Sequence, residues 1–99
     1  MDGSAIEVSA KGKGNRSEYK TIALLEAAGY SCTRSGASLG VWDVIGIGSK
    51  DVVLVQVKSN RWPLEAEMET LRNFVCPMMC RKLVHRWRDR VKLPDVKEL

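Results

Sequence analysis

The sequence has little of several features that define other protein classes. Its one histidine, His85, has no clear partner, and we assign it no catalytic role. Its three cysteines are an odd number without a paired framework, which is typical of a reducing compartment. No run of about 18 apolar residues could cross a bilayer, and the first residues do not resemble a signal peptide. We therefore expect an intracellular protein with no membrane partner.

The cysteines do not make a convincing metal centre. Cys76 and Cys80, with His85 after them, could supply three soft ligands. Their spacing is not that of a standard zinc knuckle, and a fourth ligand is missing. We expect buried thiols instead.

Length and charge allow one domain and favour an anionic partner. The 99 residues are 44% apolar, enough for one modest core. There are 16 Lys and Arg against 12 Asp and Glu, so the net charge of +4 is compatible with a polyanion but far from histone-like density. Residues 1–14, with several glycines and lysines, are predicted to be a flexible basic arm. Residues 15–99 are predicted to form the single domain.

The pattern along the chain predicts an α/β fold. A helix should run from Asn15 or Ser17 to Ala28 and end at Gly29, a residue suited to a left-handed cap. The later segments are predicted to be strands at 30–34, 41–47 and 52–58, and a helix at 64–75 with Met68, Leu71 and Val75 on one apolar side. Residues 81–91 are predicted to be a last strand near a sheet edge, with a basic side. Pro94 should mark the end of regular pairing. The strand at 52–58 is apolar on both sides, so we expect it to be central, with helices on each face.

Polar side chains interrupt two of these apolar strands. Asp43 lies in the first, and Gln56 and Lys58 lie in the second. A two-residue hairpin loop at Ser49 and Lys50 would place Asp43 opposite Gln56, with their Cβ atoms about 5 Å apart. Lys58 would share this face by alternation, whereas a three-residue loop would separate the polar groups. Buried charged and polar groups of this kind usually hold a metal ion or form a charge network.

Helical spacing adds a second carboxylate. Glu18 falls on the same narrow face as Ile22 and Leu25, at about 100° per residue, and so should face the sheet.

These segments together resemble the PD-(D/E)XK nuclease superfamily. More narrowly, the segments at 15–18, 29–30, 34–38 and 42–46 look like those of archaeal Holliday junction resolvases and their viral relatives. The resemblance spans about residues 14 to 90. It implies a restriction-endonuclease-like core, a central mixed sheet flanked by helices in the order αβββαβ. The VRR-NUC nucleases share this core and are a second possible match.

The resemblance implies a metal-dependent, structure-specific DNA endonuclease. Mg²⁺ or Mn²⁺ would be bound by Asp43, the Gln56 side chain, the Val57 carbonyl and Glu18, while Lys58 would complete the catalytic set of Glu18, Asp43, Gln56 and Lys58. Substrate-binding candidates are Arg16, Arg34, Ser35, Ser38 and Arg61. The implied partners are branched or junction DNA and a second copy of the chain in a homodimer. The implied location is the cytoplasm or nucleoid, or a virus-infected host cell.

Two residues depart from the resolvase pattern. Trp42 replaces a proline, and we expect it to wedge at the strand entry or stack on a base. Gln56 replaces a glutamate, which removes an anionic oxygen and should weaken metal binding. A helix carboxylate could compensate, and the candidates are Glu65, Glu67 and Glu69. Alternatively, the chain is a non-catalytic DNA-binding module, a VRR-NUC-type flap, nick or single-strand nuclease, or a small protein-interaction domain.

Each site residue also has an ordinary structural interpretation. Asp43 could end a strand, Lys58 could be the solvated end of one, and Glu18 could interact favourably with its helix dipole. Ser35 and Ser38 could simply be loop residues. The co-occurrence of Asp43, Gln56 and Lys58 is what favours the nuclease interpretation.

Overall fold

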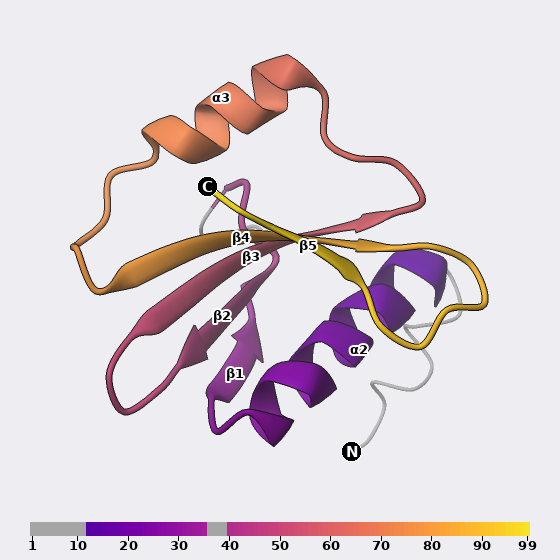
Figure 1. Ribbon diagram of the computed structural model, residues 1–99, viewed down its shortest axis with the longest axis horizontal. Coiled ribbons are helices and arrows are strands. Elements are labelled where there is room, and N and C mark those ends of the chain that lie inside the picture. Colours follow the sequence, from indigo (N-terminus) through magenta and orange to yellow (C-terminus); the bar gives the residue numbers. More distant parts are fainter. Residues whose placement is uncertain (1–11, 36–39) are drawn as a thin grey trace.

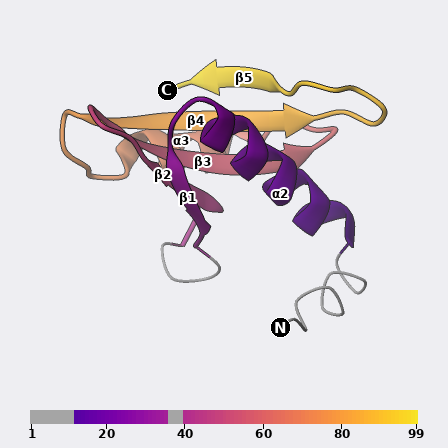
Figure 2. The same cartoon turned by 90° about the horizontal axis from the view of Figure 1, so that it is seen from below.

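The computed structural model describes residues 12–35 and 40–99, with side chains from residue 16 onward. Its elements are α2 (Gly12–Ala27), β1 (Ser31–Arg34), β2 (Val44–Ile47), β3 (Val52–Ser59), α3 (Glu65–Asn73), β4 (Cys80–Trp87) and β5 (Asp95–Glu98). The strands form one sheet in the order β1-β2-β3-β4-β5. Only the β3 and β4 pair is parallel within it, so the sheet is mixed as predicted. Helices α2 and α3 lie on opposite faces of the sheet (Figures 1 and 2).

Helix α2 packs against the sheet through the predicted stripe. Leu25 is buried in one core cluster, and Ile22 packs against that cluster. The helix ends at Ala27, and Gly29 follows with a φ of 101°, which favours glycine at this position. The helix begins at Gly12, earlier than the predicted Asn15 or Ser17, so residues 12–14 of the expected arm are helical. Residues 1–11 of that arm lie outside the described residues.

The β2–β3 hairpin has the predicted register. Ile47 pairs with Val52 and Val44 with Val55, as the predicted two-residue loop requires. The ladder ends at Val44, and the Asp43 amide donates to the carbonyl of the same Val55 at 2.9 Å, so the predicted pairing of Asp43 with Gln56 is not part of it. The Gly48 amide donates to the Asp51 carbonyl at 2.8 Å, closing the two-residue loop.

Strand β3 is central, with a separate core on each side. Val53 and Val55 pack in the cluster that contains Leu25 of α2. Leu54, on the alternate side, packs with Met68 and other residues of the α3 face. The alternation therefore sends Gln56 and Lys58 to one face, as predicted, and that face is the α3 side of the sheet.

Helix α3 is shorter than predicted. It covers Glu65–Asn73, whereas the sequence suggested 64–75. Met68 and Leu71 are buried as expected. Val75 was wrongly placed on the apolar side, because the helix ends before it and its side chain is 91% exposed.

Strand β4 lies near the sheet edge as predicted, but it is not the last strand, because β5 follows it and forms the edge. It is paired on both sides, in parallel with β3 and antiparallel to β5. Pro94 does not end the pairing, since β5 begins immediately after it at Asp95. The basic residues of β4 are neutralised across the new pair: Arg86 binds Asp95 and Arg81 binds Glu98. The positive charge of these residues was the reason for expecting one side of this strand to face solvent. Among the described helices, none is both long and apolar enough to span a bilayer.

Candidate active site

Asp43 ties together the ends of β2 and β3. Its backbone amide donates to the Val55 carbonyl at 2.9 Å. Its carboxylate Oδ2 accepts a hydrogen bond from the Val57 amide at 2.8 Å. The side chain therefore lies against β3 at Val57, the residue between Gln56 and Lys58, and it reaches β3 through this side-chain contact instead of the predicted pairing with Gln56.

The environment of Asp43 disfavours its ionised form. Burial raises the pKa of its carboxyl above the usual value, and the like charge of Glu18 raises it further. The hydrogen bond from Val57 and the positive charges of Lys58 and Arg34 act in the opposite direction. Burial is the largest effect, so the carboxylate is under-compensated and suited to a cationic partner.

Gln56 is buried and only half of its amide is satisfied. The side chain is 8% exposed, and its Nε2 donates to the Val41 carbonyl at 3.3 Å. Its Oε1 is buried with no hydrogen-bond partner among the described residues. Buried carbonyl oxygens in native proteins normally have a partner, so this atom is a candidate ligand for a cation or a substrate group.

Lys58 lies between the sheet and α3. Its Nζ is 3.9 Å from Glu67 Oε1, at the outer limit of an ion pair, and its charge also acts on Asp43. The same Glu67 oxygen accepts the Leu64 amide at 3.0 Å, which caps the helix.

The contacts distinguish among the three helix carboxylates that spacing could not rank. Glu65 and Glu69 both bind Arg72, at 3.0 and 3.2 Å. Glu67 is the one that reaches Lys58.

Glu18 faces the sheet but is already paired. Its Oε1 accepts from Arg34 Nε at 2.7 Å, and Arg34 lies over the Tyr19 ring with its guanidinium carbon 5.2 Å from the ring centroid. Arg34 Nη1 also donates to the Tyr19 hydroxyl at 3.3 Å. The pair brings two predicted site residues together at the edge formed by α2 and β1, and its carboxylate influences Asp43 electrostatically.

Ser35 supports the backbone that carries Asp43. It is buried, its hydroxyl donates to the Trp42 carbonyl, and its amide donates to the Asp43 carbonyl at 2.9 Å. The other predicted serine, Ser38, lies outside the described residues.

Arg16 and Arg61 are near this cluster in sequence, two residues before Glu18 and three residues after Lys58. Both are exposed, Arg16 on α2 and Arg61 in the turn after β3, where its amide donates to the Ser59 carbonyl at 2.8 Å.

Trp42 is a core residue, which corrects the expectation that it could stack on a base. It is 0% exposed and packs edge-on against Phe74, with ring centroids 5.7 Å apart. Its position within an apolar run was the signal for burial.

A buried polar network was missed entirely. Thr21 Oγ1 accepts from Trp87 Nε1 at 2.8 Å and lies 3.2 Å from His85 Nδ1. These residues are distant in sequence, and no local pattern connects α2 with β4.

The donor set fits a hard cation better than zinc. The described residues contain no group of three or more His, Cys, Asp or Glu side chains placed to hold a metal. Cys76 and Cys80 pack with the α3-side core, and all three cysteines are half-buried free thiols, so the expectation of buried thiols is met in part. The Asp43 carboxylate and Gln56 Oε1 are oxygen donors, and Mg²⁺ commonly binds through one or two carboxylates while keeping several waters.

Comparison with known proteins supports the fold. No protein-family model matches the chain, and no curated protein matches it significantly. Among solved structures, the Holliday junction resolvase Hjc of Archaeoglobus fulgidus, an archaeal hyperthermophile, superposes with a TM-score of 0.65 at 22% identity. The match covers 88% of this chain and 71% of the resolvase chain. With its mixed sheet between two helices, this chain therefore has a restriction-endonuclease-like fold.

Proposed function

We propose that this protein is a metal-dependent, structure-specific DNA endonuclease that hydrolyses phosphodiester bonds in the manner of a Holliday junction resolvase. One observation carries the proposal. The half-buried Asp43 carboxylate is fixed to the Val57 amide between Gln56, whose buried Oε1 has no partner in the described chain, and Lys58. The resolvase-like fold supports the same conclusion.

Asp43, Gln56 Oε1 and the Val57 carbonyl would hold Mg²⁺ or Mn²⁺, with Glu18 contributing directly or through water. When bound, the cation would supply charge neutralisation at the scissile phosphate and a more acidic water. Lys58 supplies a fixed positive charge beside Asp43, which favours the extra negative charge of the transition state. Burial strengthens this interaction because less water screens the charges.

The surrounding residues would position DNA. Arg16, Arg34 and Arg61 are suited to backbone phosphates because a guanidinium can donate two parallel hydrogen bonds. Ser35 would act by holding the Asp43 segment, and Ser38 remains a proposed phosphate contact. A homodimer would present two such sites to the two equivalent strands of a junction, and the proposed place of action is intracellular.

A second candidate function is a DNA-binding module without catalysis. Two observations favour it: the motif position holds the neutral Gln56, and Glu18 is occupied by Arg34 at 2.7 Å. Both reduce the negative charge available to a divalent cation.

Cleavage assays separate the two functions. Four-way junction, duplex, nicked, flapped and single-stranded DNA are incubated with purified protein in Mg²⁺, Mn²⁺ or EDTA. The nuclease proposal predicts cation-dependent cutting, greatest on the junction, that is lost in Asp43→Ala and Lys58→Ala. Binding without cutting in either cation would favour the module. Cutting that survives both substitutions would exclude the proposed site.

Matched variants on α3 test whether a helix carboxylate compensates for Gln56. Glu67→Gln and Glu65→Gln each remove one negative charge from the same helix. Compensation predicts that only Glu67→Gln reduces cleavage, because Glu67 is the carboxylate that contacts Lys58. Equal activity of the two variants would exclude it. Gln56→Glu should increase cation affinity in the same assays.

A further inference from the structure

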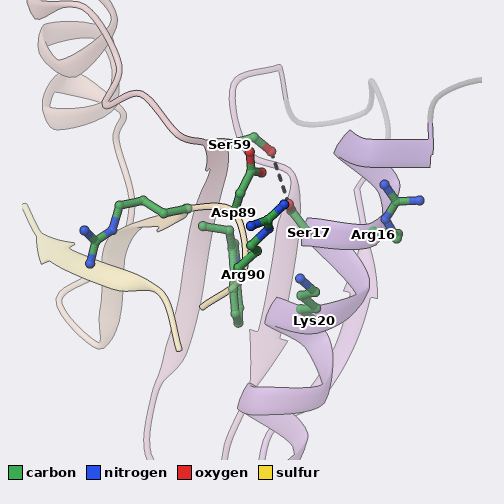
Figure 3. A pocket seen from close by; sticks show the side chains of 8 residues that line it. Arg16, Ser17, Lys20, Ser59, Asp89 and Arg90 are labelled. Carbon is green, nitrogen blue, oxygen red and sulfur yellow. Dashed lines mark hydrogen bonds between the residues drawn. The ribbon is translucent and has the colours of Figure 1, made fainter. Parts of the chain in front are cut away.

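A basic pocket of about 320 Å³ lies beside the candidate active site. It opens between α2, the end of β3 and the turn that follows β4 (Figure 3). It is lined by Arg16, Ser17, Lys20, Ser59, Trp87, Arg88, Asp89 and Arg90. None of the catalytic residues proposed above lines it.

Two hydroxyls from different elements meet in this pocket. Ser17 Oγ on α2 and Ser59 Oγ on β3 are 3.2 Å apart, and Figure 3 shows Arg90 extending toward them. One hydroxyl proton is used in their mutual hydrogen bond, so the other can donate to an oxygen in the pocket. The pair thus offers a neutral donor among cations, a combination suited to a phosphate oxygen.

The pocket carries a net positive charge, and Lys20 lies over its Trp87 ring with Nζ 5.4 Å from the centroid. Four cationic side chains line it against the single carboxylate of Asp89. Arg88 binds Asp95 at 3.1 Å, but in the described part of the chain no carboxylate pairs with Arg16, Lys20 or Arg90. Like charges gathered without counter-charges repel each other, and an anion would relieve that repulsion.

The turn holds Arg90 in an uncommon conformation. Its φ is 66°, in the left-handed region that side-chain-bearing residues rarely adopt. Asn60, with a φ of 67°, anchors this turn because its amide donates to the Trp87 carbonyl at 2.8 Å and its Oδ1 accepts the Asp89 amide at 3.1 Å. Such backbone strain, about 1 kcal/mol per residue, is concentrated at functional sites. The turn therefore fixes Arg90 relative to the end of β3.

The pocket adjoins the candidate active site on both α2 and β3. Ser17 precedes Glu18, and Ser59 follows Lys58. Because side chains alternate along β3, Ser59 faces α2 while Lys58 faces α3. Both residues lie at the end of β3, so a DNA strand that crosses this end would have one phosphate on the Lys58 side and a neighbouring phosphate on the Ser59 side.

We propose that this pocket is a second phosphate site, which binds a backbone phosphate neighbouring the scissile one on the same DNA strand. The proposal rests on the DNA-binding part of the proposed function. It assigns the pocket a positioning role: Arg90 and the Ser17–Ser59 pair set which phosphate lies at Lys58.

The first test measures binding with no cation present. Affinity for four-way junction DNA is measured in EDTA for the wild type, Arg90→Asn and Lys50→Asn. Asparagine tolerates the left-handed backbone at position 90, and Lys50 is an exposed lysine at the β2–β3 turn whose loss changes the net charge equally. We expect about tenfold weaker binding for Arg90→Asn and a smaller loss for Lys50→Asn. Equal losses in the two variants would overturn the proposal.

The second test locates the phosphate. Single methylphosphonates, which lack the backbone negative charge, are introduced one at a time around the cleavage position. One methylphosphonate next to that position should weaken DNA binding by the wild type about tenfold. The same methylphosphonate should leave binding by Arg90→Asn unchanged, because the DNA change and the protein change remove the same interaction. The absence of such a position would contradict the assignment.

A titration with inorganic phosphate, followed by NMR at the Trp87 indole, distinguishes the sources of the ligand. Phosphate-dependent shifts in a wild type that also binds DNA support the proposal. Shifts in a protein that binds no DNA would overturn the strand assignment in favour of free phosphate. A wild type that binds DNA but does not cleave it would refute the nuclease proposal and leave the phosphate-site proposal standing, because the binding tests of the pocket need no cation.

Discussion

Asp43 is a residue whose charge costs stability in the free protein. Burial raises the pKa of its carboxyl, so its ionised form is less favourable in the fold than in the unfolded chain. The folded state therefore binds the proton more tightly, and stability is lost as pH rises from the ordinary Asp range through the raised value.

Asp43→Asn should accordingly increase the free energy of unfolding at pH 7. Its side-chain oxygen can still accept the Val57 amide, while the buried charge is removed. Urea denaturation at pH 7 and at pH 3 measures the difference, which should shrink at pH 3, where the wild-type carboxyl is protonated. A variant less stable than the wild type at pH 7 would contradict this account.

His85 sets a second pH dependence, of the opposite sign. Burial lowers its pKa to about 4, and it is 2% exposed beside the Thr21 hydroxyl. Between pH 6.5 and 4 the unfolded chain binds the proton and the fold does not, so stability falls as pH decreases through this window. The loss of unfolding free energy from His85 is about 3 kcal/mol below pH 4, and there is no such loss above pH 7.

The variant His85→Gln isolates this effect because glutamine keeps an acceptor for Thr21 but does not titrate. Its free energy of unfolding, measured by urea denaturation from pH 7 to 4, should fall less steeply than that of the wild type. Parallel curves for the two proteins would show that His85 is protonated equally in the folded and unfolded states.

At the scale of elements, β2 packs closely because one of its positions has no side chain. A Cβ on Gly46 would lie 2.8 Å from Val53 Cγ2 and 3.3 Å from Cys32 Sγ. Val53 is 1% exposed and branched at Cβ, so it cannot rotate away freely.

We predict that Gly46→Ala destabilises the protein by about 1–3 kcal/mol. The double variant Gly46→Ala with Val53→Ala should show favourable coupling, because the smaller residue at 53 removes the clash. Thermal and urea unfolding of the four proteins of this cycle provide the measurement. Additive effects would indicate that the two positions do not meet.

The β2–β3 hairpin could be predicted because the residues that determine it are close together in the sequence. The apolar runs and the short turn determine the register that pairs Ile47 with Val52 and Val44 with Val55. The position of β4 depends on β5, a short strand after Pro94 that buries little surface and carries charge. Its pairing is stabilised by long-range contacts such as Arg81 with Glu98, which periodicity cannot reveal.

The candidate site was predictable to the same extent. The shared face of Gln56 and Lys58 follows from alternation along β3. Asp43 precedes β2 and meets β3 through the Val57 amide. Two contacts could be seen only in the structure. Glu67, and not Glu65 or Glu69, is the helix carboxylate near Lys58, and Glu18 pairs with Arg34. Both depend on side-chain conformations at element boundaries, where helix spacing leaves several residues equivalent.

For the whole molecule, the net charge of +4 should govern association with DNA. If basic groups bind backbone phosphates, the logarithm of affinity falls linearly with the logarithm of salt concentration, with a slope of about −0.9 per phosphate on duplex DNA. Fluorescence anisotropy with junction DNA in EDTA, from 50 to 300 mM salt, measures it. Affinity that is independent of salt would contradict DNA binding and favour an interaction domain. Sedimentation over the same conditions tests the proposed homodimer.

The central claim is that the ends of β2 and β3 bind a divalent cation. A crystal structure of the wild type soaked in Mn²⁺, with anomalous scattering to identify the ion, tests it most directly. The account predicts a cation about 2.0–2.6 Å from an Asp43 carboxylate oxygen and Gln56 Oε1. A cation bound elsewhere, or a Gln56 amide that turns its nitrogen toward Asp43 in the presence of saturating Mn²⁺, would contradict it.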